Sequence, residues 1–189
     1  MKVLVYKAHN MQTASDYGLL IVDIQGKLAE LVNNSEEMIS NTKKLVKCCQ
    51  ILSIPVVVLE QNPKGLGSTT ASLRECIDEY VPLEKYTFSG LAESHIKEAI
   101  TSLNKRTWLV AGIEAHICVY QTVRDLLKED LAVEVVSDCI SSRRKSNLDL
   151  AIENMRHEGA KITSVEMAIY EIMQSNKARE FKEVLKIIK

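Results

Sequence analysis

The chain lacks the features that mark nucleic-acid-binding and membrane proteins. Its formal net charge is −1, and the basic cluster at 143–145 is too short to form the broad positive surface that nucleic acid binds. No apolar run approaches the roughly 18 residues that cross a bilayer. Residues 1–6 also lack the apolar core and cleavage site of a signal peptide. We therefore expect a cytoplasmic protein without nucleic-acid or membrane partners.

Paired-cysteine motifs are missing as well. The five cysteines are an odd number, and none has the C-x-x-C spacing of a zinc or redox site. In a reducing compartment they are free thiols, and most free thiols are small buried side chains. Only sequence context can single out a catalytic thiol among Cys48, Cys49, Cys76, Cys118 and Cys139.

No linker, composition break or internal repeat divides the 189 residues, a length typical of one domain. Apolar, β-rich runs alternate with helical patterns, and the first two runs are continuous, as in strands buried on both faces of a parallel sheet. The strand runs lie at 19–22, 56–59, 108–113, 132–136 and 161–163, and the helical patterns at 36–52, 91–103, 117–127, 148–155, 166–173 and 178–188. We predict one α/β domain over 1–189, with a mainly parallel, open, Rossmann-like sheet flanked by helices on both faces.

Charged residues gather where the predicted strands end. Ligands of open parallel sheets bind outside the carboxyl ends of the strands, so Asp23, Glu60 and Lys85 are candidates for one crevice. A carboxylate that directly continues an apolar strand must be paired, solvated or partly protonated. The alternative for Asp23 is a turn cap, and for Glu60 loop capping is the favoured alternative.

Cys118 follows the strand run at 108–113, on or near the first turn of a helix. A helix start lowers the pKa of a thiol, and its free amides can bind a developing oxyanion. The alternative is a small buried residue that packs the helix against the sheet. The other four cysteines have no such setting, and we expect them to be inert.

A nucleophilic thiol needs a base, and histidine is the usual one. His9 and His95 have no strand-end context, His157 lies late in a helical pattern, and we expect surface roles for all three. His116 lies two residues before Cys118 and is predicted to line the pocket. The other option for the base is a carboxylate with a lysine, which Asp23 and Lys85 supply.

Three motifs in order resemble isochorismatase-like hydrolases: LLIVDIQ at 19–25, EKYTFSG at 84–90 and VAGIEAHICVYQTVRDL at 110–126. SDCISSR at 137–143 extends the resemblance over nearly the whole chain. The resemblance implies an isochorismatase-like hydrolase fold with an Asp, Lys and Cys site from three strand ends. It implies Asp23 as general base, Lys85 as the charge that holds the thiolate and orients the aspartate, and Cys118 as nucleophile.

The resemblance also implies a cis peptide between Ile113 and Glu114, and an oxyanion hole made by the backbone nitrogens of Glu114 and Cys118. Candidates for the pocket are Gln25, Glu60 and His116. The stretch EQNPKGLGST at 60–69 lacks the Asp-x-His metal motif of nicotinamidases in this superfamily. We therefore expect a site without metal or cofactor.

Isochorismatases proper do not rely on a nucleophilic cysteine, so the presence of Cys118 favours attack on a carbonyl group. The predicted function is therefore hydrolysis of a small amide-type substrate through a Cys118 thioester. Two alternatives stay open: the same triad acting on a carbamoyl group or ester, and a non-catalytic scaffold that retains the triad. The apolar segments 166–173 and 178–188 predict a homo-oligomer, a dimer or larger.

Overall fold

The computed structural model describes residues 12–189, so the predictions for residues 1–6 and for His9 lie outside it. The described part contains a six-stranded sheet in the order β3-β2-β1-β4-β5-β6, and every neighbouring pair is parallel. Its strands are β1 (Tyr17–Val22), β2 (Val56–Gln61), β3 (Leu83–Lys85), β4 (Thr107–Gly112), β5 (Ala132–Ile140) and β6 (Lys161–Thr163). The strand order reverses between β1 and β4, and this is the point where such sheets bind ligands.

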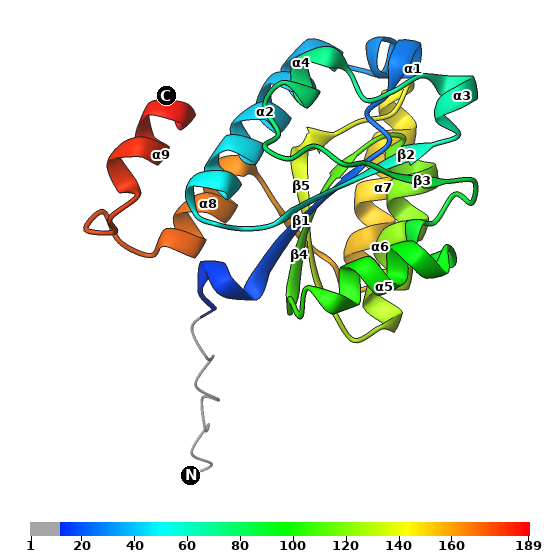
Figure 1. The fold of residues 1–189 in the computed structure, drawn as a ribbon. Coiled ribbons are helices and arrows are strands. Elements are labelled where there is room, and N and C mark those ends of the chain that lie inside the picture. Colours follow the sequence, from blue (N-terminus) through cyan, green and yellow to red (C-terminus); the bar gives the residue numbers. More distant parts are fainter. Residues whose placement is uncertain (1–11) are drawn as a thin grey trace.

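Helices cover both faces of the sheet (Figure 1). One face carries α2 (Ser35–Ile51), α8 (Val165–Met173) and α9 (Phe181–Ile188), and the other carries α5 (Ser94–Ser102), α6 (Tyr120–Lys128) and α7 (Lys145–His157). The short helices are α1 (Gly26–Leu31), α3 (Pro63–Leu66) and α4 (Ala71–Arg74). Single turns lie at Ala14–Asp16, Gly90–Ala92 and Ala115–Val119. The predicted α/β class is therefore confirmed.

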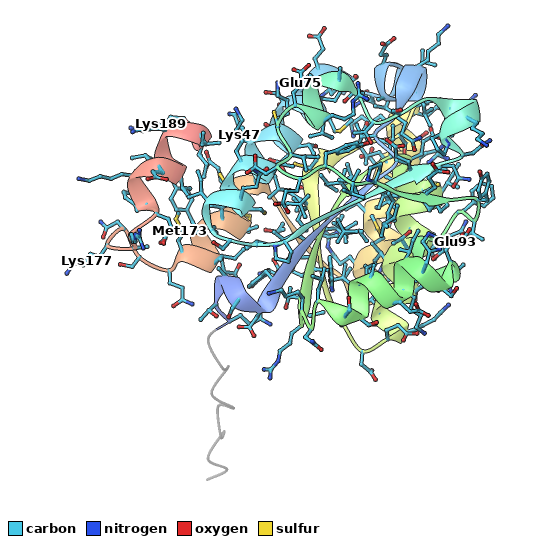
Figure 2. All side chains as sticks on the ribbon, viewed as in Figure 1. Lys47, Glu75, Glu93, Met173, Lys177 and Lys189 are labelled. Carbon is cyan, nitrogen blue, oxygen red and sulfur yellow. The ribbon has the colours of Figure 1, made fainter. Side chains whose placement is uncertain are left out.

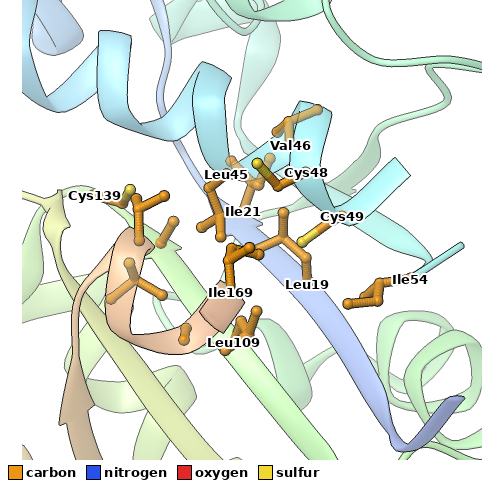
Figure 3. Packing of buried hydrophobic residues seen from close by; sticks show 14 of the residues in the cluster. Leu19, Ile21, Leu45, Val46, Cys48, Cys49, Ile54, Leu109, Cys139 and Ile169 are labelled. Atoms are coloured by element: carbon orange, nitrogen blue, oxygen red, sulfur yellow. The ribbon is translucent and has the colours of Figure 1, made fainter. Parts of the chain in front are cut away.

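The two helical layers enclose two apolar cores, one on each face. All residues of β1 are buried, and because side chains alternate along a strand, Leu19 and Ile21 join one core while Leu20 and Val22 join the other. Figure 3 shows Leu19 and Ile21 packed with side chains of α2 and α8. Charged side chains such as Lys47, Glu93 and Lys177 lie at the periphery (Figure 2).

The observed elements differ from the predicted ones mainly at their ends. Glu60 was predicted to follow a strand but lies inside β2, and Cys139 was predicted to follow the fourth run but lies inside β5. Residue 117 was predicted to begin a helix, but 115–119 form a π turn and α6 begins at Tyr120. Within residues 12–189, no helix is long and apolar enough to cross a membrane.

Candidate active site

Three strand ends bring Asp23, Lys85 and Cys118 to the carboxyl edge of the sheet. Asp23 directly follows β1, Lys85 is the last residue of β3, and Cys118 lies in the π turn that follows β4. The Nζ atom of Lys85 donates a hydrogen bond to Oδ2 of Asp23 at 2.7 Å. Both side chains are almost fully buried, with exposed fractions of 0% and 4%.

The ammonium group of Lys85 has further partners. It donates to Oε1 of Gln61 at 2.7 Å and to the carbonyl oxygens of Thr87 and Phe88 at 3.2 Å each. Glu93 fixes the segment that supplies these carbonyls, because Oε1 of Glu93 accepts from the backbone amides of Tyr86 and Thr87. The lysine is therefore surrounded by acceptors, as a buried cation must be.

The second oxygen of Asp23, Oδ1, is buried and has no hydrogen-bond partner among residues 12–189. Burial raises the pKa of Asp23 above its ordinary value, although the charge of Lys85 and contacts with Lys85 and Cys118 act in the opposite direction. Asp23 also has a positive φ of 54°, a conformation that is uncommon outside glycine. The protein thus maintains a buried carboxylate oxygen that is free to accept a proton.

Cys118 is also buried, with 8% of its surface exposed. The pKa of its thiol is raised to about 12, because burial, the largest cause, and the charge of Asp23 outweigh the charge and hydrogen bond of Lys85, which lower it. The prediction that this pKa is lowered is therefore wrong, because desolvation of the buried thiolate is the largest cause and raises it. The site at neutral pH holds a neutral thiol beside the Asp23–Lys85 pair.

Gly112 allows β4 to pass close to the end of β1. A Cβ atom at this position would lie 2.2 Å from the carbonyl oxygen of Val22, and the φ of Gly112 is +143°. The next peptide bond but one, between Ile113 and Glu114, is cis. The close approach at Gly112 places the end of β4 against the end of β1, just before the turn that carries Cys118.

Arg143 holds the buried carboxylate of Glu114. Its backbone amide donates to Oε1 at 3.1 Å, its Nε to Oε1 at 2.8 Å and its Nη2 to Oε2 at 3.2 Å. Burial raises the pKa of Glu114, but the hydrogen bonds and charge of Arg143 outweigh it and hold the pKa below its usual value. The basic cluster at 143–145 therefore supplies a structural ion pair next to the cis peptide.

His116 connects the π turn to the start of α7. Its Nδ1 lies 3.0 Å from Oγ of Ser142, and its Nε2 lies 3.2 Å from Nδ2 of Asn147. An asparagine Nδ2 can only donate, so Nε2 is the acceptor and Nδ1 carries the proton that is donated to Ser142. Both ring nitrogens of this predicted pocket residue are thus used within the protein.

The side chains of the other two pocket candidates, Gln25 and Glu60, form hydrogen bonds with the backbone at and after the end of β2. Gln25 accepts from the amide of Gln61 at 2.7 Å and donates to the carbonyl oxygens of Gln61 and Gly67 at 3.1 and 2.7 Å. Oε1 of Glu60 accepts from the amide and hydroxyl of Thr69 at 2.6 and 2.8 Å, and from the hydroxyl of Tyr80. These contacts attach loop 62–70 to the ends of β1 and β2, in agreement with the loop-capping alternative for Glu60.

Sequence reasoning missed Gln61, which contacts Lys85. The two residues are register partners in the β2–β3 ladder, so their side chains lie on the same face of the sheet. Only an assignment of the three-residue strand β3, with its register, could have revealed this contact.

A cavity of about 210 Å³ lies between the start of α2 and the end of β5, lined by Asn33, Glu37, Asn41 and Asp138 among others. Among residues 12–189, no group of three or more His, Cys, Asp and Glu side chains is arranged to hold a metal ion.

Comparisons with known proteins identify the family. The Isochorismatase domain matches residues 17–167. The secreted isochorismatase effector Isc1 of Phytophthora sojae (strain P6497) is 35% identical over 175 residues, covering 90% of this chain and 83% of the relative.

Two solved structures share the fold. The MAR1 ribonuclease of Caenorhabditis elegans superimposes with a TM-score of 0.88 at 35% identity, covering 94% of this chain and 91% of that one. The YcaC gene product of Escherichia coli, described as an octameric hydrolase of unknown specificity, has a TM-score of 0.87 at 17% identity, covering 96% and 92%. By its matched domain and its similarity to Isc1, this chain belongs to the isochorismatase family.

Proposed function

We propose that this protein is a cysteine hydrolase that cleaves a small amide-type substrate, with Asp23, Lys85 and Cys118 as its catalytic triad. The proposal is supported chiefly by the buried Asp23–Lys85 pair, because the Asp23 carboxyl group contacts the Cys118 thiol and keeps one buried oxygen, Oδ1, without a partner among residues 12–189. A buried ion pair is costly to desolvate, and strongly perturbed pKa values at a strand-end site favour a functional role. The isochorismatase family, to which the chain belongs, is named for a hydrolase.

The raised pKa of Cys118 determines how the thiol is activated. A thiol with a pKa of about 12 is almost entirely protonated at pH 7, so the sulfur must lose its proton as it attacks. Asp23 accepts that proton while Sγ bonds to the carbonyl carbon. Asp23 then gives the proton to the leaving amine, and the carbon–nitrogen bond breaks to leave a Cys118 thioester.

In the hydrolysis of the thioester, water takes the place of the thiol as nucleophile and Sγ becomes the leaving group. Asp23 takes a proton from water, the hydroxide attacks the carbonyl carbon, and the carbon–sulfur bond breaks as the acid is released. The proton returns to Sγ, which restores the neutral thiol. In both steps the backbone nitrogens of Glu114 and Cys118 are the proposed donors to the oxyanion, and Lys85 keeps Asp23 oriented and balances its charge.

The direct test is turnover by the variant Cys118→Ala on a panel of small amides, carbamoyl compounds and esters. We expect loss of hydrolysis, with Cys76→Ala as the matched control because Cys76 is partly exposed and outside the site. A mass increase on the Cys118 peptide of the wild type would identify the acyl intermediate. Wild-type hydrolysis by Cys118→Ala would refute the mechanism.

The same panel separates the alternatives. If carbamoyl compounds or esters acylate Cys118 and amides do not, the triad acts on one of these electrophiles and not on an amide. An absence of turnover on every compound, with Cys118 never modified, would support a scaffold that retains the triad.

Because the Caenorhabditis elegans protein is named a ribonuclease, an RNA substrate belongs in the panel. Cleavage of RNA by the wild type would contradict the expectation of a small-molecule substrate.

We also propose a cytoplasmic homo-oligomer. The oligomer is supported by exposed apolar side chains near the site, Leu66, Tyr86 and Phe88, which are 40%, 62% and 56% exposed. The cytoplasm is supported by five cysteines that form no disulfide. Light scattering on the purified protein tests the assembly, and fractionation of cells tests the compartment. A monomeric mass or a secreted product would refute the respective proposal.

A further inference from the structure

The side chain of Gln61 lies at the outer side of the Asp23–Lys85 pair. Its Oε1 accepts from Nζ of Lys85 at 2.7 Å, the same distance as the bond from Lys85 to Asp23. Its Nε2 donates to the carbonyl oxygen of Tyr86 at 3.0 Å. The amide has one possible orientation, because an ammonium only donates and a carbonyl oxygen only accepts.

The backbone of Gln61 is fixed as firmly as its side chain. Both its amide and its carbonyl oxygen are bonded to the buried side chain of Gln25, which follows Asp23 by two residues. Gln25, Gln61, Lys85 and Asp23 thus form a closed circuit of hydrogen bonds and covalent chain. Displacement of Gln61 would break this circuit at the lysine.

The acceptors around Lys85 outnumber its protons. An ammonium group has three N–H donors. The short bonds to Asp23 and Gln61 take two of them, and the carbonyl oxygens of Thr87 and Phe88 share the third at 3.2 Å each. Lys85 also contacts the Cys118 thiol, so it acts on the reaction through Asp23, through the thiol and through its charge.

We propose that Gln61 is a positioning residue of the active site, which holds the ammonium of Lys85 against Asp23 by accepting one of its three protons. This inference rests on the proposed function of the triad. A neutral acceptor is suited to this position, because it orients the lysine without competing with Asp23 for its charge. A carboxylate at residue 61 would draw the ammonium away from Asp23, and an aliphatic side chain would leave one donor without a partner.

The test measures the pH dependence of Cys118 alkylation by iodoacetamide, read as modification of the Cys118 peptide by mass spectrometry. Lys85 lowers the pKa of the thiol, so a less well held lysine raises it. We expect Gln61→Met to slow the reaction of Cys118 at pH 9 by about three- to tenfold, since the thiolate fraction falls tenfold per unit of pKa. Cys76 provides the reference thiol in the same sample, and Gln174→Met, at the end of α8, is the matched control.

A double-mutant cycle makes the proposal specific. Lys85→Met should slow alkylation of Cys118 more than Gln61→Met does, and adding Gln61→Met to Lys85→Met should have no further effect. An unchanged profile in folded Gln61→Met, or an equal effect of this substitution with and without Lys85, would overturn the proposal. Thermal melting verifies folding. If Gln61→Met does not fold, Gln61→Glu replaces it, with the same slower alkylation expected and an unchanged profile overturning the proposal.

Alkylation does not depend on turnover, so the two proposals can fail separately. Hydrolysis that survives in Cys118→Ala would refute the proposed function. A Gln61 variant that leaves the alkylation profile unchanged would refute only the positioning role.

Discussion

The Nζ atom of Lys85 lies 2.7 Å from Oδ2 of Asp23, and neither side chain is more than 4% exposed. The desolvation of two buried charges is repaid only when both keep good partners. Lys85 has four acceptors, whereas Asp23 keeps one oxygen without a partner among residues 12–189. This asymmetry leaves the aspartate available for proton transfer and makes the lysine a fixed charge.

Removal of the lysine alone should be costly for stability. Lys85→Met leaves the carboxylate of Asp23 buried without its counter-ion, and breaking a buried pair in this way costs about 3–5 kcal/mol in the free energy of unfolding. The double variant Asp23→Asn with Lys85→Met should recover part of the loss, because no charge is then left buried. Urea unfolding of the three proteins measures this. A double variant that loses the sum of the single losses would contradict the prediction.

Asp23→Asn should make Cys118 more reactive toward iodoacetamide while it abolishes hydrolysis. The charge of Asp23 raises the pKa of the thiol, so its removal lowers this pKa from about 12 and increases the thiolate fraction at pH 8. A neighbouring charge shifts a pKa by about 1–3 units, so alkylation should be at least about tenfold faster. Slower alkylation in this variant would show that the aspartate favours the thiolate instead.

The acid side of the pH–rate profile should report Asp23. A protonated Asp23 cannot accept the proton of Cys118, so kcat/KM falls as the pH falls through the pKa of this carboxyl. Because burial raises that pKa, the fall should occur above the ordinary value of 3.8. The profile needs a substrate from the panel and a parallel check that the protein stays folded. A fall centred below pH 3.8 would exclude Asp23 as the base.

The sequence was sufficient to place the main residues of the candidate site at one edge of the sheet. The runs before Asp23 and Cys118 are wholly apolar, which is a strong signal for buried parallel strands, and parallel strands bring their carboxyl ends together. The contacts of Lys85 could not be predicted from the sequence, because they depend on the register of β3 with β2 and on the loop that follows β3. Gln61 was missed for this reason.

The sequence was also a poor guide to side-chain environment. Gln25 and Glu60 have polar side chains near strand ends, but their partners lie in loop 62–70, whose path no local pattern describes. The pKa of Cys118 depends on how much protein covers the thiol, whereas the helix-start rule considers only the backbone around it. Burial is a property of the whole fold, and it reversed the expected direction of the shift.

Arg143→Ala should destabilise the protein in a pH-dependent way. Arg143 holds the pKa of Glu114 below its usual value of 4.5, so the pair contributes stability above that pH. The contribution is lost as the pH falls through the lowered pKa, because protonation of Glu114 ends the ion pair. The melting temperatures of wild type and variant should therefore differ at pH 7 and converge as the pH falls below 4.5 through the lowered pKa. Arg144→Ala, one residue away, is the control. A difference that is independent of pH would exclude the ion pair as its cause.

Gly112→Ala should cost far more stability than Gly159→Ala, although both glycines have a positive φ. At Gly112 a Cβ would lie 2.2 Å from the carbonyl oxygen of Val22, so β1 and β4 would have to separate next to Asp23. At Gly159 nothing lies within 4 Å of the Cβ, and the cost is only the backbone strain of about 1–3 kcal/mol. Gly112→Ala should also lose hydrolysis while Gly159→Ala keeps it. Equal losses in unfolding free energy and activity would mean that the close approach of β4 to Val22 has no special role.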